Sequence, residues 1–507
     1  MKNIFKRIIT LFVVIALMLS FVACKGGQTV SDDSSLNAEI YETPNAGNDT
    51  VLYNKQTSKY DSMADTMRQG IIDSADSELT GLFGTYYVSY KGNDDNDGTT
   101  PETAWKTIDK VNSMNMMLSS SVVLFERGGV YRGNLQVISN CSYGAYGTGP
   151  KPCIYGSKRN YADESIWTKS TEYEGAWETT IVDNGLDSMS VGHIVFDHGV
   201  KVATKILSTD TNPKEYEYYC KDKKVYLFIS DNPAKLYDSI EMGDNKHIIS
   251  GESVKFVVIE NLCIKYGGLH GMSFRGENNN PCEDIVIRNC EVGYIGGCAS
   301  TPPLGNGIEF WLSTKNVTVE NCWVYECFDA GITNQGRDTT HVQEGITYKN
   351  NLIEYCTYGI EYFAKGHGEG SVIRDTLYTG NLIRFSGYGW CDPATRYNET
   401  WKIGGIAPIN GWGSNWFVGK FDATNFVIEN NIFDTSWKYI INAYKPNQEN
   451  RVVIRNNTYY QKKVGTACVW YDANENKVVS AETEEQFKEE IAKIDTSPKE
   501  VVFELTN

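Results

Sequence analysis

The strongest constraint on the fold is a set of seven similar stretches in the C-terminal half of the chain. Five follow one another from Val254 onward, and two more come after a gap. Each begins with an alternating apolar run that reaches an Asn, and in the first five a second short run and a Gly follow. The Asn residues are Asn261, Asn289, Asn321, Asn350, Asn381 (one place later in its stretch), Asn430 and Asn456. Repeats of this length cannot bury an apolar face alone, so they must stack on one another.

Each stretch holds two strand-like runs joined by a tight turn, which predicts one coil of a right-handed parallel β-helix, an all-β solenoid. Asn tolerates the left-handed turn conformation, and its side-chain amide can bond to an Asn on the next coil. We therefore expect Asn261, Asn289, Asn321 and Asn350 to be stacked at one turn. A β-sandwich whose hairpins carry Asn is the alternative, but sandwich turns rarely repeat one residue at one phase.

Residues 1–24 have the order of an export signal, with basic residues first and then the apolar run Ile8–Phe21, which is too short to span a membrane. The run ends in Phe21-Val22-Ala23-Cys24, which resembles the lipobox of bacterial lipoproteins. We expect a protein anchored through a lipid on Cys24 to the extracellular face of the cell membrane. An ordinary cleaved signal with an incidental Cys is the alternative.

Composition divides the remainder of the chain into three parts. Residues 25–84 are expected to form a flexible tether with a short helix over Met63–Leu82. The β-helix is expected over 85–465, with a small inserted β subdomain at about 160–245 that breaks the repeat. A helix that begins at Pro101 is expected to cap the first coil, and 466–507 are expected to cap the far end with a helix preceded by Ser480.

Charge and cysteine content restrict the partners. The net charge of −17 argues against nucleic acid. The chain has no closely spaced Cys or His pairs of the kind that bind zinc, and we expect a monomer without a cofactor. The loop at 93–98 imitates the start of a calcium loop but lacks the Glu at the twelfth position, so calcium stays an alternative to ordinary turns. Stacking places Cys290 next to Cys322 and Cys327 next to Cys356, as buried thiols or, alternatively, as disulfides.

Each turn is followed by a strand that begins at a Gly. Aligning the repeats on this Gly shows which side chains lie on the same face of the sheet. Strand alternation directs one set of residues inward: Met272, Ile308, Ile332 and Ile360. The next residues form an outward column: Ser273, Glu309, Thr333 and Glu361. A second outward column runs beside it: Arg275, Trp311, Gln335 and Phe363. Rings stack on sugar faces, while Arg and amide groups bind hydroxyls and carboxylates, so this face is the candidate site.

Two carboxylates in the first column are candidate catalytic groups. Glu309 and Glu361 are two coils apart, so their backbones should be separated by roughly 9.5 Å. Glycosidases place their carboxyls about 5–5.5 Å apart for retention and about 6.5–9.5 Å apart for inversion, so the pair fits inversion better. Asp329, at the turn before the Thr333 strand, is a third candidate. Solvated surface charge is the alternative for the two Glu residues, and a turn role for Asp329.

Further residues are candidate ligands of a substrate. His270 and Asn306 precede their strands at equivalent places, and His341, Lys365 and His367 lie in Gly-rich loops above them. The Trp-rich segment 401–417, which includes Trp412, is long enough to form a wall of the groove.

The stretches YYVSYKGNDDNDGTTPETAWKTIDKVN and GAYGTGPKP, together with the Asn-marked coils, resemble the right-handed parallel β-helix proteins of the pectate-lyase-like superfamily. The resemblance covers residues 85–465 and implies the same fold. The superfamily includes polysaccharide lyases, glycoside hydrolases and epimerases. Its calcium-dependent lyases use a cluster of Asp ligands, which is not aligned here, whereas its hydrolases use a carboxylate pair.

The carboxylate pair therefore favours a surface glycoside hydrolase that cleaves a polysaccharide or oligosaccharide. A lyase acting on a uronate-containing glycan, with Arg275, Lys365 or His367 as base, is one alternative. A glycan-binding surface protein without catalytic activity is the other.

Overall fold

The computed structural model describes residues 50–182, 190–210, 212–297, 304–337, 340–365, 371–391, 407–412, 421–443, 452–463, 465–472 and 477–505. All of them belong to one of two compact units, residues 41–507. The signal segment with Cys24 lies outside the described residues. Within the described part, no helix is long and apolar enough to cross a membrane.

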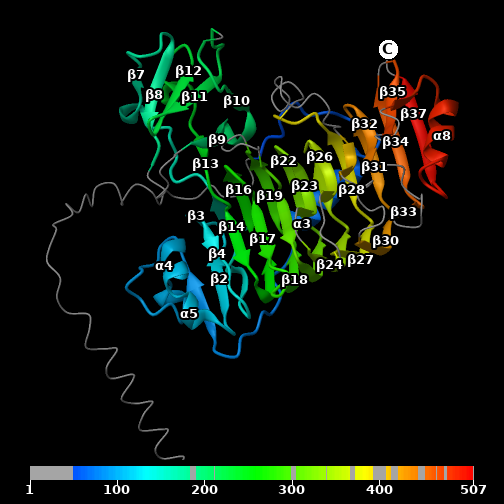
Figure 1. The fold of residues 1–507 in the computed structure, drawn as a ribbon. Helices are drawn as coiled ribbons and strands as arrows, with labels where there is room; N and C mark the ends of the chain where they lie inside the picture. Colours follow the sequence, from blue (N-terminus) through cyan, green and yellow to red (C-terminus); the bar gives the residue numbers. More distant parts are fainter. Residues whose placement is uncertain are drawn as a thin grey trace, which may run out of the picture. The chain divides into compact units, whose positions relative to one another are not determined.

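Three sheets of parallel strands form the β-helix, and strands of successive coils lie side by side in each (Figure 1). The first contains β1 (Thr85–Val88), β2 (Val122–Glu126), β5 (Ser142–Tyr146), β15 (Lys255–Glu260), β18 (Cys282–Arg288), β21 (Thr314–Glu320), β24 (Val342–Lys349), β27 (Ser371–Thr379), β30 (Phe421–Glu429) and β33 (Val452–Arg455). The second contains β3 (Val130–Arg132), β6 (Cys153–Tyr155), β16 (Cys263–Gly267), β19 (Glu291–Ile295), β22 (Trp323–Cys327), β25 (Leu352–Glu354), β28 (Leu382–Ser386), β31 (Ile432–Ser436), β34 (Thr458–Lys463) and β37 (Glu500–Leu505).

The third sheet presents the candidate site. It contains β4 (Leu135–Gln136), β14 (Ile249–Glu252), β17 (Met272–Gly276), β20 (Ile308–Leu312), β23 (Ala330–Arg337), β26 (Tyr358–Lys365), β29 (Ala407–Trp412), β32 (Tyr439–Ala443), β35 (Ala467–Asp472) and β36 (Lys477–Ala481). Among the described strands of this sheet, only β35 and β36 pair in antiparallel fashion. The predicted inward column is confirmed: Met272, Ile308, Ile332 and Ile360 are in register and fully buried.

The Asn residues of the repeat have two separate roles. Asn261, Asn289, Asn321 and Asn350 occupy one turn on successive coils with φ between 49° and 56°, as predicted. The amide ladder is formed one position later, where the side chain points inward. Its members are Asn351, Asn381, Asn431 and Asn457. The first three each donate from Nδ2 to the Oδ1 of the next Asn at 2.8–3.0 Å, and Asn457 Nδ2 donates to Asp495 Oδ2 at 2.9 Å. Asn381 is displaced in the repeat because Gly380, with φ of 67°, takes the left-handed position before it.

The ends of the β-helix are covered as expected, with corrections in detail. At the N-terminal end, η1 (Pro101–Thr103), α4 (Ile108–Ser113) and α5 (Asn115–Leu118) form the cap. The loop acids serve turns and caps: Asp94 accepts hydrogen bonds from Lys106 and Thr107, and Asp97 from Thr99 and Thr103. At the far end, α8 (Glu484–Ala492) is capped by Thr483 rather than Ser480, and β37 extends the second sheet beyond residue 465.

The insertion is a small, mainly antiparallel β unit with a core of its own. It contains β7 (Thr168–Lys169), β8 (Ala176–Thr180), β9 (Val191–Phe196), β10 (Lys201–Lys205), β11 (Glu217–Lys221), β12 (Lys224–Phe228) and β13 (Ile240–Asp244), with short helical turns η2 (Glu164–Ile166), η3 (Asp197–Gly199) and α6 (Pro233–Leu236). It joins the second sheet where Asp244 of β13 pairs with Gly267 of β16. The predicted inserted subdomain is therefore confirmed.

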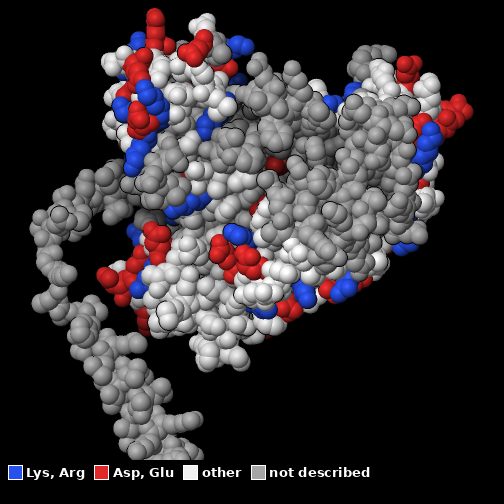
Figure 2. All heavy atoms as spheres, viewed as in Figure 1, with Lys and Arg blue, Asp and Glu red and all other residues white. Residues whose placement is uncertain are grey.

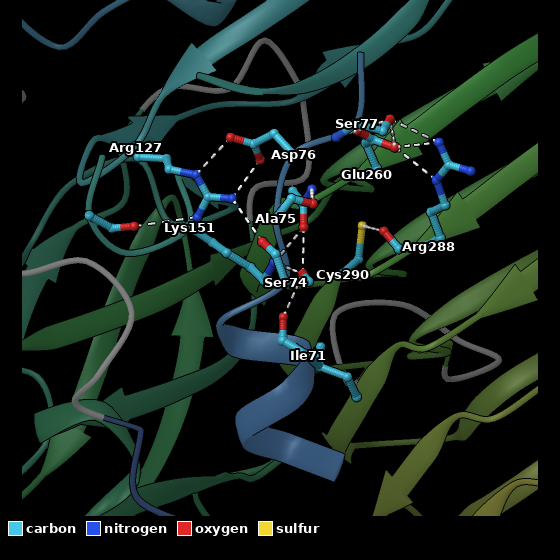
Figure 3. A network of polar contacts seen from close by, with 12 residues as sticks. Ile71, Ser74, Ala75, Asp76, Ser77, Arg127, Lys151, Glu260, Arg288 and Cys290 are labelled. Carbon is cyan, nitrogen blue, oxygen red and sulfur yellow. Dashed lines mark hydrogen bonds and ion pairs between the residues drawn. The ribbon is translucent and has the colours of Figure 1, made fainter. Parts of the chain in front are cut away.

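Residues 50–77, which we call the strap, do not form the expected flexible tether. They pack along the second sheet, and their helix α3 (Asp61–Ile72) ends ten residues before the predicted end at Leu82. Figure 3 shows how the end of the strap is fixed. Lys151 Nζ donates to Ser74 Oγ and to Asn261 Oδ1, each at 2.7 Å, and Ser77 Oγ donates to Glu260 at 2.6 Å. Composition alone missed this because the polar residues of the strap find partners on distant coils.

Buried charges lie where the strap meets the second sheet. The side chain of Arg384 is 3% exposed, and its guanidinium lies 3.6 Å from Glu354 and 3.2 Å from Asp434. It also pairs with Asp61 of the strap. Arg68 of the strap contributes a second contact to Glu354 at 2.8 Å. Burial raises the pKa of the Asp434 carboxyl to about 6, and Arg384 opposes that rise.

The stacked cysteines are buried thiols, as the sequence favoured. Cys290 and Cys322 lie on adjacent coils, as do Cys327 and Cys356, and all four are buried and unbridged.

Candidate active site

The register of the third sheet brings the predicted site residues into the two expected columns. Ser273 pairs with Glu309, Glu309 with Thr333, and Thr333 with Glu361. In the neighbouring column, the backbone of Arg275 pairs with that of Trp311, which is followed by Gln335, Phe363 and Trp412. The side chains of Phe363, Lys365 and Trp412, and His367 as a whole, lie outside the described residues.

The two columns differ in exposure, which corrects the expectation that both carboxylates face open solvent. Glu309 is 5% exposed and Glu361 4%, whereas Trp311 and Gln335 are partly exposed and Arg275 is exposed. Both carboxylates lean onto the preceding coil: Ser273 Oγ donates to Glu309 Oε2 at 2.8 Å, and Thr333 Oγ1 donates to Glu361 Oε2 at 3.1 Å.

Because both lean in the same direction, their separation stays near the two-coil spacing of roughly 9.5 Å. Gln335 Nε2 also donates to Glu361 Oε2 at 2.5 Å, so this carboxylate is held from both columns.

Glu309 has the most elaborate environment of the site. Besides Ser273, Asn306 Nδ2 donates to its Oε1 at 3.1 Å, and His270 Nε2 lies 3.2 Å from its Oε2. Burial raises the pKa of the Glu309 carboxyl, and the nearby charge of Asp329 adds to the rise. A carboxyl whose protonated form is favoured in this way keeps its proton to a higher pH than an ordinary Glu, which suits a proton donor.

His270 and Asn306, predicted as ligands of a substrate, therefore contact Glu309 directly. His270 is buried, and its ring stacks on that of His247 with centroids 5.0 Å apart and an interplanar angle of 3°. Burial lowers the pKa of both imidazoles to about 4, so both are neutral at neutral pH.

The sequence analysis missed His247, although a signal for it was present. Ile249 of β14 pairs with Met272, so His247 occupies the same place before its strand as His270 does. Aligning the repeats one strand earlier, before Val254, would have found it.

The remaining candidates lie at different places. Asp329 precedes β23; its N–H donates to Gly305 O at 3.0 Å, and its charge acts on both Glu309 and His270. Arg275 forms an exposed ion pair with Glu277 at 3.1 Å. His341 is buried with its ring against Gly336. The described residues contain no group of three or more His, Cys, Asp or Glu that could hold a metal ion.

Comparisons with known proteins support the fold. Residues 231–392 match the family described as "Right handed beta helix region", which confirms the predicted fold. A comparison with curated proteins gives no match.

Among solved structures, the chain is similar to one titled "Glycoside hydrolase", with 10% identity, a TM-score of 0.42, and 83% of this chain and 96% of that chain covered. It is also similar to a GH136 lacto-N-biosidase from Eubacterium ramulus, with 13% identity, a TM-score of 0.37, and 88% and 70% covered. A third is pectate lyase Pel9A, with 10% identity, a TM-score of 0.38, and 78% and 72% covered. These neighbours are carbohydrate-active enzymes of β-helix fold, both hydrolases and lyases.

Proposed function

We propose that this protein is a glycoside hydrolase with Glu309 as general acid and Glu361 as general base. The observation that carries the proposal is Glu309, a buried carboxyl with a raised pKa that lies in one column with a second carboxyl two coils away. A spacing of roughly 9.5 Å leaves room for a water molecule beside the sugar, as inversion requires.

In the proposed reaction, the protonated Glu309 gives its proton to the glycosidic oxygen as the bond to the anomeric carbon breaks. Glu361 takes a proton from a water molecule that attacks the anomeric carbon from the opposite face. The product has the inverted configuration, and a proton exchange with solvent restores both carboxyls. Asp329 is not required as a proton carrier; its charge favours the protonated form of Glu309.

The substrate is proposed to be a neutral or weakly charged polysaccharide or oligosaccharide. Trp311 and Gln335 are partly exposed beside the buried carboxylates, so a sugar lying on Trp311 reaches the edge of the Glu column. On the face seen in Figure 2, the described Lys and Arg side chains are scattered among Asp and Glu rather than gathered into one patch. The net charge of −17 also disfavours a polyanionic glycan.

A panel of plant and host polysaccharides and oligosaccharides, incubated with the soluble fragment from residue 41 onward, tests the proposal. New reducing ends without unsaturated product are expected from at least one glycan, and a chelator added to parallel reactions checks that calcium is not needed. Unsaturated product would instead indicate a lyase, and binding without any cleavage would indicate a glycan-binding protein.

Trp311 is expected to contribute to binding rather than to chemistry. Trp311→Ala should weaken the affinity for the glycan by about 1–3 kcal/mol, the range for aromatic stacking on flat ligands, while kcat changes little. Isothermal titration with a catalytically inactive variant measures the affinity. Tyr90→Ala, in the loop that follows β1, is the control, and an unchanged affinity in Trp311→Ala would place the binding surface elsewhere.

We further propose that the enzyme is held at the outer face of the cell membrane by a lipid on Cys24, as the order of the signal residues indicates. Cys24→Ser is expected to move the protein from the membrane fraction into the soluble fraction or the medium. Immunoblots of the two fractions measure this, and retention equal to that of the unmodified chain contradicts lipid anchoring.

A further inference from the structure

We propose that His270, stacked on His247, is a positioning residue that makes Oε1 the oxygen of Glu309 that carries and delivers the acid proton. The inference rests on the proposed function, in which Glu309 is the general acid. The buried histidine pair thereby sets which oxygen of Glu309 holds the proton, through hydrogen bonds that backbone N–H groups fix.

The backbone fixes the tautomer of His270. The N–H groups of Asn306 and Gly305 point at His270 Nδ1, at 2.9 and 3.3 Å. Two donors at Nδ1 require a lone pair there, so the proton of the neutral ring is on Nε2. Nε2 lies 3.2 Å from Glu309 Oε2, and it therefore donates to that oxygen.

The orientation of Asn306 is fixed in the same way. Its Oδ1 accepts the N–H of Ala330 at 3.0 Å, so its Nδ2 must be the atom that faces Glu309 Oε1, at 3.1 Å. An amide placed by a backbone donor cannot turn over without leaving that N–H unpaired.

The two oxygens of Glu309 are consequently unequal. Oε2 receives two hydrogen bonds, from Ser273 Oγ and from His270 Nε2. From the residues that the structure describes, Oε1 receives only the bond from Asn306. Since each carboxyl oxygen has two lone-pair sites, Oε2 is saturated as an acceptor, and the acid proton belongs on Oε1.

His247 keeps this arrangement neutral. It accepts the backbone N–H of His270 at Nδ1, at 3.3 Å, and the two rings lie nearly parallel. The titratable groups that act on the cluster are Glu309 itself, Asp329 and the two imidazoles. An imidazolium here would draw the proton off Glu309, but burial holds the pKa of both rings near 4.

The first measurement uses the unaltered protein and needs no substrate. Long-range ¹H–¹⁵N spectra report which imidazole nitrogen is protonated, and His270→Gln identifies the His270 signals. The expected result between pH 5 and 8 is a neutral ring with the proton on Nε2. A ring protonated on Nδ1, or an imidazolium at pH 7, overturns the proposal.

The second measurement compares two variants by infrared difference spectroscopy, in which Glu309→Gln identifies the carboxyl band of Glu309. If the proton is on Oε1, the C=O bond ends at Oε2, and loss of the His270 donor in His270→Leu should shift this band to higher frequency. His270→Gln keeps a donor near the Nε2 position and should leave the band close to its original place. An unmoved band in folded His270→Leu overturns the assignment.

Kinetics then separates the two proposals. His270→Leu should lower kcat by about 10- to 100-fold with little change in KM. It should also move the alkaline limb of the pH profile of kcat to higher pH, by about 1–2 pH units, because Glu309 loses a donor that stabilises its carboxylate. His270→Gln should restore most of the kcat value and most of the original position of the alkaline limb. If the unaltered protein cleaves no glycan but the spectra behave as expected, the proposed function fails while the assignment of the proton stands.

Discussion

Replacing Glu309 with Gln is expected to lower kcat by about 10²–10⁴-fold, the usual contribution of a positioned proton donor. Gln keeps the size of the side chain, and its amide oxygen can still accept from Ser273 and His270, but its amide nitrogen then faces the Asn306 donor and it cannot transfer a proton. Glu361→Gln should have an effect of the same order, and the double variant should be little worse than either single one, because the pair acts as a unit. Steady-state kinetics on the glycan found by the panel measures all three.

The pH dependence follows from the environment of Glu309. Because burial and then Asp329 raise the pKa of this acid, its protonated, active form persists to a higher pH than for an ordinary Glu. The kcat value should fall as the pH rises through that pKa. Asp329→Asn removes one cause of the rise, so the falling limb should move to lower pH while most of the maximal rate remains.

Circular dichroism and thermal unfolding must show that each variant is folded, since both Glu residues are buried. A folded Glu309→Gln protein with near-original turnover would falsify its assignment as the acid. If Asp329→Asn abolishes turnover and Glu361→Gln does not, the base is Asp329.

Replacing Arg384 with Met is expected to lower the free energy of unfolding by about 3–5 kcal/mol, because it leaves the buried Asp434 without its cation and the buried Glu354 with Arg68 alone. Glu354 and Asp434 lie within 3.6 and 3.2 Å of this guanidinium, and their side chains are 1% and 0% exposed. The contact with Asp61 is lost as well, so the strap should loosen. Denaturation by urea, followed by circular dichroism, measures the change.

The decrease in the free energy of unfolding caused by Arg384→Met should be larger at pH 8 than at pH 5. The pKa of Asp434 is about 6 in the folded protein, above its ordinary value, so the folded state binds more protons than the unfolded state and stability falls as the pH rises through this range. Without Arg384 that pKa rises further, and protonation at low pH relieves more of the cost.

Arg455→Met is the matched control, because Arg455 pairs with Glu429 at 2.7 Å while 46% of its side chain is exposed. It should cost less than about 1 kcal/mol at either pH. Equal losses of unfolding free energy in the two variants would show that the buried ion pairs under the strap stabilise the fold no more than an exposed ion pair does.

The sequence by itself determined the β-helix and the register of its third sheet. A repeat that places one residue type at the same turn of each coil fixes which strands stack, and strand alternation then fixes which side chains share a face. For this reason the positions of Glu309, Thr333 and Glu361 in one column, and of Met272 and Ile308 in the core, could be predicted from spacing alone.

Only the tertiary structure decided what surrounds those side chains. Outward alternation predicted solvated carboxylates, but Glu309 is buried because His270 and Asn306, from the turns, and Ser273, from the preceding coil, close on it. The strap pairs with residues more than 200 positions away, such as Arg68 with Glu354, and no local pattern records such partners. Repetition along the chain specifies the scaffold, whereas the protonation of a buried carboxyl depends on contacts that repetition does not encode.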